Sequence, residues 1–221
     1  MDSVDLADSR AQQARRDLTR ELALAFADLG SEARRLAKAM DSAPKEQVSL
    51  ALAAGLTSSV AGELVSGIVV LAEARVAYGA AALVRQLVET EYLAWAVTQD
   101  PEDALDWLTS TKRVRMAKWQ PGRIRGRADG RFPNSDYGNH CEVGGHPTPE
   151  GARAILDGRD LWVEVTLYET ALHGSNAWHY LMKALDSGKN VDATHARVDN
   201  AIATWRERDR LASWRPSETN K

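Results

Sequence analysis

The residue types that most readily do chemistry gather in a glycine-rich stretch, residues 137–151. It holds two of the five histidines, the only cysteine and four of the fifteen glycines. His140, Cys141 and His146 are residue types that can ligate zinc or act as nucleophile and general acid or base. Zinc motifs combine two closely spaced halves, and no second half occurs here. The spacing therefore predicts no metal ligand. A metal site on the His140 loop is a weaker alternative, and elemental analysis of the purified protein tests it.

The end of this stretch has the pattern of a helix start. Pro147 biases the preceding His146 towards extended backbone. Thr148 suits the N-cap of a helix and Pro149 its first position. We therefore expect His146 to lie at the rim of a cavity, just before a helix begins.

A polar stripe runs along an otherwise apolar segment around Arg85. The residues within about 40° of Arg85 at 100° per residue are Tyr78, Glu89, Tyr92 and Ala96. Because most of the remaining circumference is apolar, we expect this helix to be central and the stripe to be buried, paired or open to a cavity. Two interpretations stay open. Arg85 and Glu89 form an ion pair that locks helix packing, or Arg85 anchors an anion while Glu89 orients it or acts as a base.

Two further histidines lie in the helix predicted for residues 161–185. His179 could point into the same cavity as Arg85, although a single histidine on such a face is also typical of a hydrogen-bonded core residue. Glu169 and His173 form an i,i+4 pair, which we predict to face solvent. The pair lacks the duplicated Glu-x-x-His pattern of di-iron bundles.

A basic run lies between these two segments. Its members are Lys112, Arg113, Arg115, Lys118, Arg123, Arg125, Arg127 and Arg131, with Trp119 and Phe132 among them. This composition is typical of a phosphate-contacting surface, and it is also that of a solvated face. The net charge of −3 argues against nucleic-acid binding by bulk electrostatics alone.

The elements that must position these residues are helices. An amphipathic pattern covers residues 13–40, and apolar sequence with no proline covers 46–99 as one or two helices with a break near 55–58. Asp100 and Pro101 start a helix that we expect to reach Gln120. The remaining helices are expected over 161–185 and 191–214, and the glycine- and proline-rich residues 121–151 as one long loop. We predict an all-α bundle of about five to seven helices.

Composition gives the domain organisation and the setting. An apolar fraction of 44 % over 221 residues suits a single domain, 13–214, with flexible ends at 1–12 and 215–221. One cysteine cannot form an internal disulfide, and no signal peptide opens the chain, so we expect a cytoplasmic protein. Residues 47–72 come nearest to a membrane span, but Glu63 interrupts them and their small residues favour close helix packing.

Two elements together resemble a known family: Arg85-Gln86-Leu87-Val88-Glu89 in a central helix, and Tyr137 to His146-Pro147 some fifty residues later, before another long helix. Over about residues 60–185 the chain resembles uncharacterised bacterial helical proteins related to the HEPN superfamily (higher eukaryotes and prokaryotes nucleotide-binding). The resemblance implies a helical bundle, often dimeric, with many members acting as metal-independent ribonucleases in toxin and antiphage systems.

The family's ribonuclease motif is Arg-x(4 to 6)-His, and this chain departs from it. The nearest case is Arg131 with His140, separated by eight residues. What carries over by position is Arg85, Glu89 and His146.

The sequence thus yields two hypotheses of different kinds. In the first, an intracellular HEPN-like protein binds or cleaves RNA or a nucleotide with Arg85, Glu89, His146 and His140 as catalytic candidates. Its candidate ligand-binding residues are Tyr78, Tyr92, Tyr137, His179 and Arg131. In the second, the chain is a non-catalytic helical dimerisation or protein-interaction module. Neither hypothesis involves a cofactor or a membrane. We expect a homodimer, and in the second hypothesis the helices assemble that dimer or engage another partner.

Overall fold

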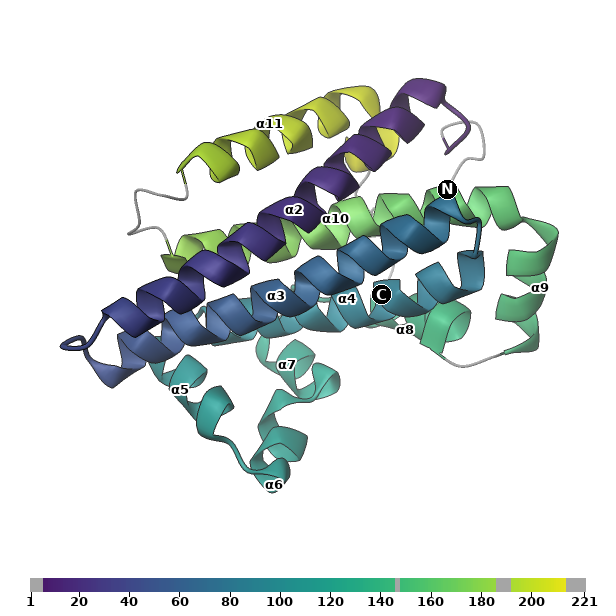
Figure 1. The fold of residues 1–221 in the computed structure, drawn as a ribbon. Coiled ribbons are helices and arrows are strands. Elements are labelled where there is room, and N and C mark those ends of the chain that lie inside the picture. The colour runs from purple at the N-terminus through teal and green to yellow at the C-terminus, as the bar shows by residue number, and fades with distance from the viewer. Residues whose placement is uncertain (1–5, 146–147, 186–191, 214–221) are drawn as a thin grey trace.

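The computed structural model describes residues 6–145, 148–185 and 192–213, and in them the protein is all-α, as predicted (Figure 1). Five long helices form the bundle: α2 (Ser9–Ala39), α3 (Lys45–Glu73), α4 (Ala77–Val97), α10 (Arg159–Leu185) and α11 (Asp192–Arg208). Short elements make up the rest: α5 (Pro101–Thr109), α6 (Lys112–Val114), η1 (Arg115–Trp119), α7 (Pro121–Arg127), α8 (Asn134–His140), η2 (Cys141–Gly145), α9 (Pro149–Asp157) and η3 (Arg210–Ser213).

The two helices α2 and α3 pack closely along their length. Asp8 caps α2 by accepting the backbone N–H of Arg10 at 2.8 Å. Glycines allow the close approach, since a Cβ added at Gly55 would lie 3.1 Å from the Cβ of Ala33 on α2. The predicted break near residues 55–58 is therefore wrong, because small residues there serve packing and α3 passes through without interruption. The chain turns instead at Arg75, whose φ is 58°.

The helix that begins at Asp100 is shorter than expected. Asp100 caps α5 by accepting the N–H of Glu102 at 2.9 Å, as predicted. However, α5 ends at Thr109 because Ser110 adopts an extended backbone, and the chain reaches Gln120 only through α6 and the π-helical turn η1.

Residues 121–151 are not one long loop. They contain α7, α8, η2 and the start of α9, so the described part of the chain has ten α-helices rather than five to seven. Pro121 opens α7 and Pro149 opens α9, where a missing backbone N–H costs nothing. Thr148 accepts the N–H of Gly151 at 3.0 Å, so the predicted cap is confirmed. Helices of seven to nine residues carry too few turns for a periodic apolar pattern, so periodicity alone did not predict α7, α8 or α9.

The core lies where α2, α3, α4 and α10 meet, with α11 along α2 (Figure 1). Trp178 and Phe26 are fully buried there with their rings edge to face, 5.7 Å apart between centroids. Among the described residues, α3 is the one helix long and apolar enough to cross a membrane by length and composition. It contacts α2, α4, α5 and α10.

Candidate functional site

Arg85, Glu89 and Tyr137 meet between α4 and α8. Nε of Arg85 lies 3.4 Å from Oε1 of Glu89, so the predicted i,i+4 pair is present. The Tyr137 hydroxyl donates to the same Glu89 oxygen at 2.9 Å and accepts from Nη2 of Arg85 at 3.4 Å. The side chains of Arg85 and Glu89 are 21 % and 23 % exposed, so the pair is partly buried. The polar stripe of α4 therefore faces the glycine-rich stretch.

The environment of this group keeps Tyr137 neutral and Arg85 charged. Burial raises the pKa of the Tyr137 phenol above its ordinary 10.0, the hydrogen bond from Arg85 opposes that increase, and the hydrogen bond to Glu89 adds to it. The hydrogen bond to Tyr137 raises the pKa of the Arg85 guanidinium. At neutral pH the phenol is therefore available as a hydrogen-bond donor.

A second guanidinium converges on the same ring. The Cζ of Arg125 lies 4.3 Å from the centroid of the Tyr137 ring, and the Cζ of Arg85 lies 5.9 Å from it. Nε and Nη1 of Arg125 are buried and have no hydrogen-bond partner among the described residues. Two guanidinium groups thus adjoin the Tyr137 ring, and of the two, Arg85 is paired with Glu89.

A second polar cluster lies next to the first, where α8 meets α10. Nδ1 of His173 lies 2.5 Å from Oε2 of Glu91, and its Nε2 lies 3.3 Å from Oε2 of Glu169. Nε2 of His140 lies 3.8 Å from the same Glu169 oxygen, and the two imidazole rings meet edge to face, 5.1 Å apart between centroids. Burial alone lowers the pKa of His173, but the two carboxylates outweigh it and hold that pKa well above 6.5.

The prediction that Glu169 and His173 face solvent is therefore wrong. The side chain of His173 is 5 % exposed and that of Glu169 is 20 % exposed. The reason is that α10 packs against α2, α3, α4 and α9 at once, which leaves it little solvent-facing surface. An i,i+4 pair shows that two residues share a face but not which neighbour covers that face.

A cavity of about 330 Å³ adjoins the second cluster. Its lining includes Ala81 and Val84 of α4, Asn139 and His140 of α8, Val143 of η2, and Glu169 and Trp162 of α10. One glycine of the stretch 137–151, Gly144, is explained by this packing. A Cβ on Gly144 would lie 2.4 Å from the carbonyl oxygen of Ala81, so only glycine lets η2 lie directly on α4 and close this cavity.

The other predicted ligand-binding residues lie outside the two clusters. Tyr78 is partly buried and packs with the apolar group around Ala77 and Ile155. His179 is exposed, and its Nδ1 lies 2.7 Å from the carbonyl oxygen of Ser175 on its own helix. Arg131 is exposed, with Nη1 3.4 Å from the Tyr180 hydroxyl.

Two predicted residues remain, Tyr92 and His146. Tyr92 is buried against Phe132, with ring centroids 4.2 Å apart, and its ring is 6.1 Å from that of Tyr137, so it backs the site. His146 lies outside the described residues. Cys141 is a partly buried free cysteine.

Sequence reasoning missed Arg125 and Glu91. Arg125 was one of eight basic residues with no feature to set it apart. Glu91 is offset by two residues from Glu89 and so lies on another face of α4. The residues three and four positions away from it are apolar, and this was the available signal.

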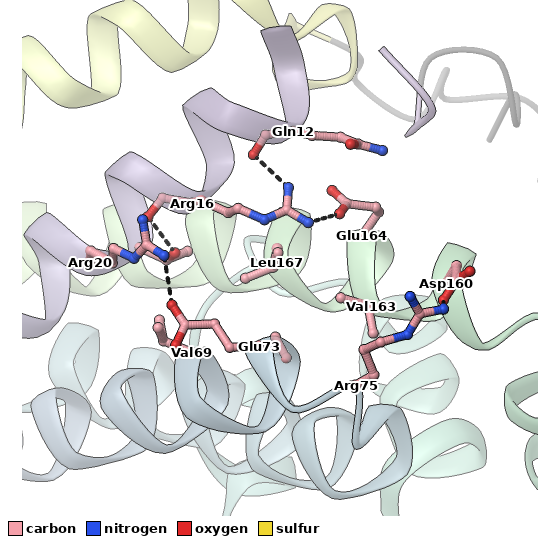
Figure 2. Close-up of a pocket in the computed structure, with 12 residues that line it drawn as sticks. Gln12, Arg16, Arg20, Val69, Glu73, Arg75, Asp160, Val163, Glu164 and Leu167 are labelled. Atoms are coloured by element: carbon pink, nitrogen blue, oxygen red, sulfur yellow. Dashed lines mark hydrogen bonds and ion pairs between the residues drawn. The ribbon is translucent and has the colours of Figure 1, made fainter. Parts of the chain in front are cut away.

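A different cavity, also of about 330 Å³, lies where α2, the end of α3 and the start of α10 meet (Figure 2). Three ion pairs line it: Arg16 with Glu164, Arg20 with Glu73, and Arg75 with Asp160. Each of these arginines is matched by a carboxylate from a different segment, so the pairs join the three helices and leave no excess charge for a ligand. We therefore place the candidate site at Tyr137 and His140.

Comparison of the chain with protein-family models, with curated proteins and with solved structures found no match.

Proposed function

We propose that this protein is an intracellular, HEPN-like helical protein that binds a phosphate-bearing ligand, RNA or a nucleotide, at Arg85, Arg125 and Tyr137. One observation carries the proposal: two guanidinium groups adjoin the Tyr137 ring, Glu89 pairs with Arg85, and Arg125 has buried N–H groups without a hydrogen-bond partner among the described residues. A buried guanidinium is stabilised by an anion that accepts its hydrogen bonds, and phosphate geometry suits it well.

The surroundings support a nucleic-acid or nucleotide ligand over a simple inorganic anion. The basic run from Lys112 to Arg131 includes α7, which carries Arg125. Tyr137 and Arg125 offer a ring and a guanidinium plane, on both of which a base can stack. Toxin or antiphage activity is the cellular setting that the HEPN resemblance implies for such binding.

Binding is tested with a fluorescently labelled single-stranded RNA and its competition by ATP. We expect Arg125→Ala and Arg85→Ala each to weaken RNA binding by about tenfold. Each should also reduce by about 1 the steepness with which the logarithm of the binding constant falls with the logarithm of the salt concentration. The matched control is Arg113→Ala, an exposed arginine of the same basic run. Equal losses in all three variants would mean that bulk charge, rather than this site, holds the RNA.

Cleavage needs a separate test. His140 and His146 are the candidate acid and base, so RNA degradation is followed with wild type, His140→Ala and His146→Ala, each with and without chelator. An equal background in every sample removes the enzymatic part of the proposal and leaves the binding part standing.

A second function, the dimerisation or interaction module, is favoured by an exposed apolar stripe on α3. Leu56, Val60 and Val70 lie on one side of the helix with 38 %, 51 % and 63 % exposure. Light scattering of wild type and Val60→Glu tests it, with Leu156→Glu on α9 as the exposed control. A dimer that dissociates only in Val60→Glu supports this function, and a monomeric wild type removes it.

A further inference from the structure

Three side chains at the junction of α8 and α10 have the arrangement of a metal site. The potential ligand atoms of His140, Glu169 and His173 all lie within 4.8 Å of one another. Two of the separations are 3.3 Å and 3.8 Å, both measured from Oε2 of Glu169 to an imidazole Nε2. Ligands at about 2.0–2.2 Å from a tetrahedral zinc ion lie roughly 3.4 Å apart, so a small movement of His140 completes the geometry.

Glu91 occupies the position of a supporting carboxylate. It lies 2.5 Å from Nδ1 of His173 and is itself 4 % exposed. Metal-bound histidines almost always donate their second ring N–H to a carboxylate or carbonyl, which fixes the ring and turns the other nitrogen towards the metal. Here that other nitrogen, Nε2, faces Glu169.

Charge balance also favours a cation. Glu91 and Glu169 bring two negative charges into a partly or fully buried cluster, and His173 can supply one positive charge. Buried charges are costly unless they are compensated. A divalent ion bound between the two imidazoles would balance both carboxylates.

The remaining side of the cluster opens to the cavity. His140 and Glu169 both line the space of about 330 Å³, whose walls are otherwise largely apolar, with Val84 and Trp162 among them. Two histidines and one glutamate with a fourth position open are the pattern of catalytic rather than structural zinc, since structural sites are closed by four protein ligands.

We propose that His140, Glu169 and His173 bind one divalent first-row transition-metal ion. Glu91 orients the His173 ring from behind, and the open coordination position of the ion faces the cavity. This inference goes beyond phosphate binding and does not depend on it, because it rests on different residues. With His140 as a ligand, any hydrolysis in the cavity would use metal-bound water in place of a histidine base.

The probe is zinc itself. Full-length protein without a histidine tag is stripped with chelator, desalted and titrated with Zn²⁺ against a chromophoric zinc chelator, in the absence of RNA. We expect one equivalent to bind. We expect Glu91→Gln to weaken zinc binding about 10–100-fold, and Glu169→Gln and His140→Ala to weaken it at least as much.

The matched control is His179→Ala, which removes an exposed imidazole from the same helix as His173 and should leave zinc affinity unchanged. Circular dichroism and thermal melting verify folding, and zinc should raise the melting temperature of wild type but not of Glu169→Gln. Should Glu169→Gln fail to fold, His140→Ala decides. Wild type that binds no stoichiometric zinc, or equal affinity in His140→Ala and His179→Ala, overturns the proposal whatever the RNA assay shows.

Discussion

The hydroxyl of Tyr137 donates a hydrogen bond to Oε1 of Glu89 at 2.9 Å, and so joins α8 to the polar stripe of the central helix α4. The same carboxylate oxygen lies 3.4 Å from Nε of Arg85. One glutamate therefore holds both the cation and the phenol of the proposed binding site. Three residues further along α8, His140 begins the second cluster, so the two sites share one short helix.

Tyr137→Phe tests this shared position, because it keeps the ring under Arg125 and removes only the hydroxyl. Glu89 and Arg85 each lose a partner, and we expect the free energy of unfolding to fall by about 1–2 kcal/mol in chemical denaturation. Tyr180→Phe is the control, since its hydroxyl accepts a long hydrogen bond of 3.4 Å from the exposed Arg131, and its loss should cost less than about 0.5 kcal/mol. Equal losses would contradict a special role for the Tyr137 hydroxyl.

The pKa of Tyr137 predicts a response to alkaline pH. Because the folded pKa lies above the ordinary 10.0, the stabilisation linked to this phenol is fully present below pH 10 and is lost as the pH rises through the folded pKa. Titration of phenolate ultraviolet absorbance should show one tyrosine that ionises late in wild type and is missing from Tyr137→Phe. If the tyrosine that is missing from Tyr137→Phe ionises at or below pH 10 in wild type, burial does not raise the pKa of Tyr137.

Gly144→Ala tests the contact that closes the cavity. The new Cβ would lie 2.4 Å from the carbonyl oxygen of Ala81, so η2 must move away from α4, and we expect a loss of about 1–3 kcal/mol in unfolding free energy. Gly138→Ala is the matched control in the neighbouring helix, where nothing lies within 4 Å of the added Cβ. That change should be neutral or stabilising by up to about 1 kcal/mol. The idea fails if the two variants melt alike.

A buried ion pair between Arg15 of α2 and Asp209, directly after α11, joins the two ends of the described chain. Asp209 accepts from Nε of Arg15 at 2.6 Å and from Nη2 at 2.9 Å, and both side chains are 0 % exposed. Asp209→Ala leaves a buried guanidinium without this carboxylate, so we expect a loss of about 3–5 kcal/mol by denaturant unfolding. The double variant Arg15→Met/Asp209→Leu should recover much of that loss. Failure of the double variant to recover stability would show that the hydrogen bonds from Trp205 and Leu211 to Asp209 matter more.

Local sequence signals located the helix ends correctly where capping chemistry was strong. Asp100 with Pro101, and Thr148 with Pro149, start helices as their side chains predict, because an N-cap depends on residues within one turn. The same reasoning was wrong near residues 55–58. Glycine there serves the approach of α2, and a packing contact with a distant helix leaves no local mark.

Part of the candidate site could likewise be predicted from the sequence, and part could not. Arg85 and Glu89 could be paired from the sequence because a helix brings residues four apart together. Arg125, Glu91 and the buried position of His173 could not, since each depends on which helix lies opposite.

The amino-acid sequence by itself determined that the chain is helical, that Arg85 lies on an otherwise apolar helix, and that the glycine-rich stretch adjoins a helix start, because these follow from periodicity and capping over a few residues. Only the tertiary structure decided that Tyr137 reaches Glu89, that His140 meets Glu169 and His173, and that Gly144 lies against Ala81. Those contacts join residues 48, 29, 33 and 63 positions apart in the chain. Packing of whole helix faces selects such partners, and no local preference of either segment encodes the choice.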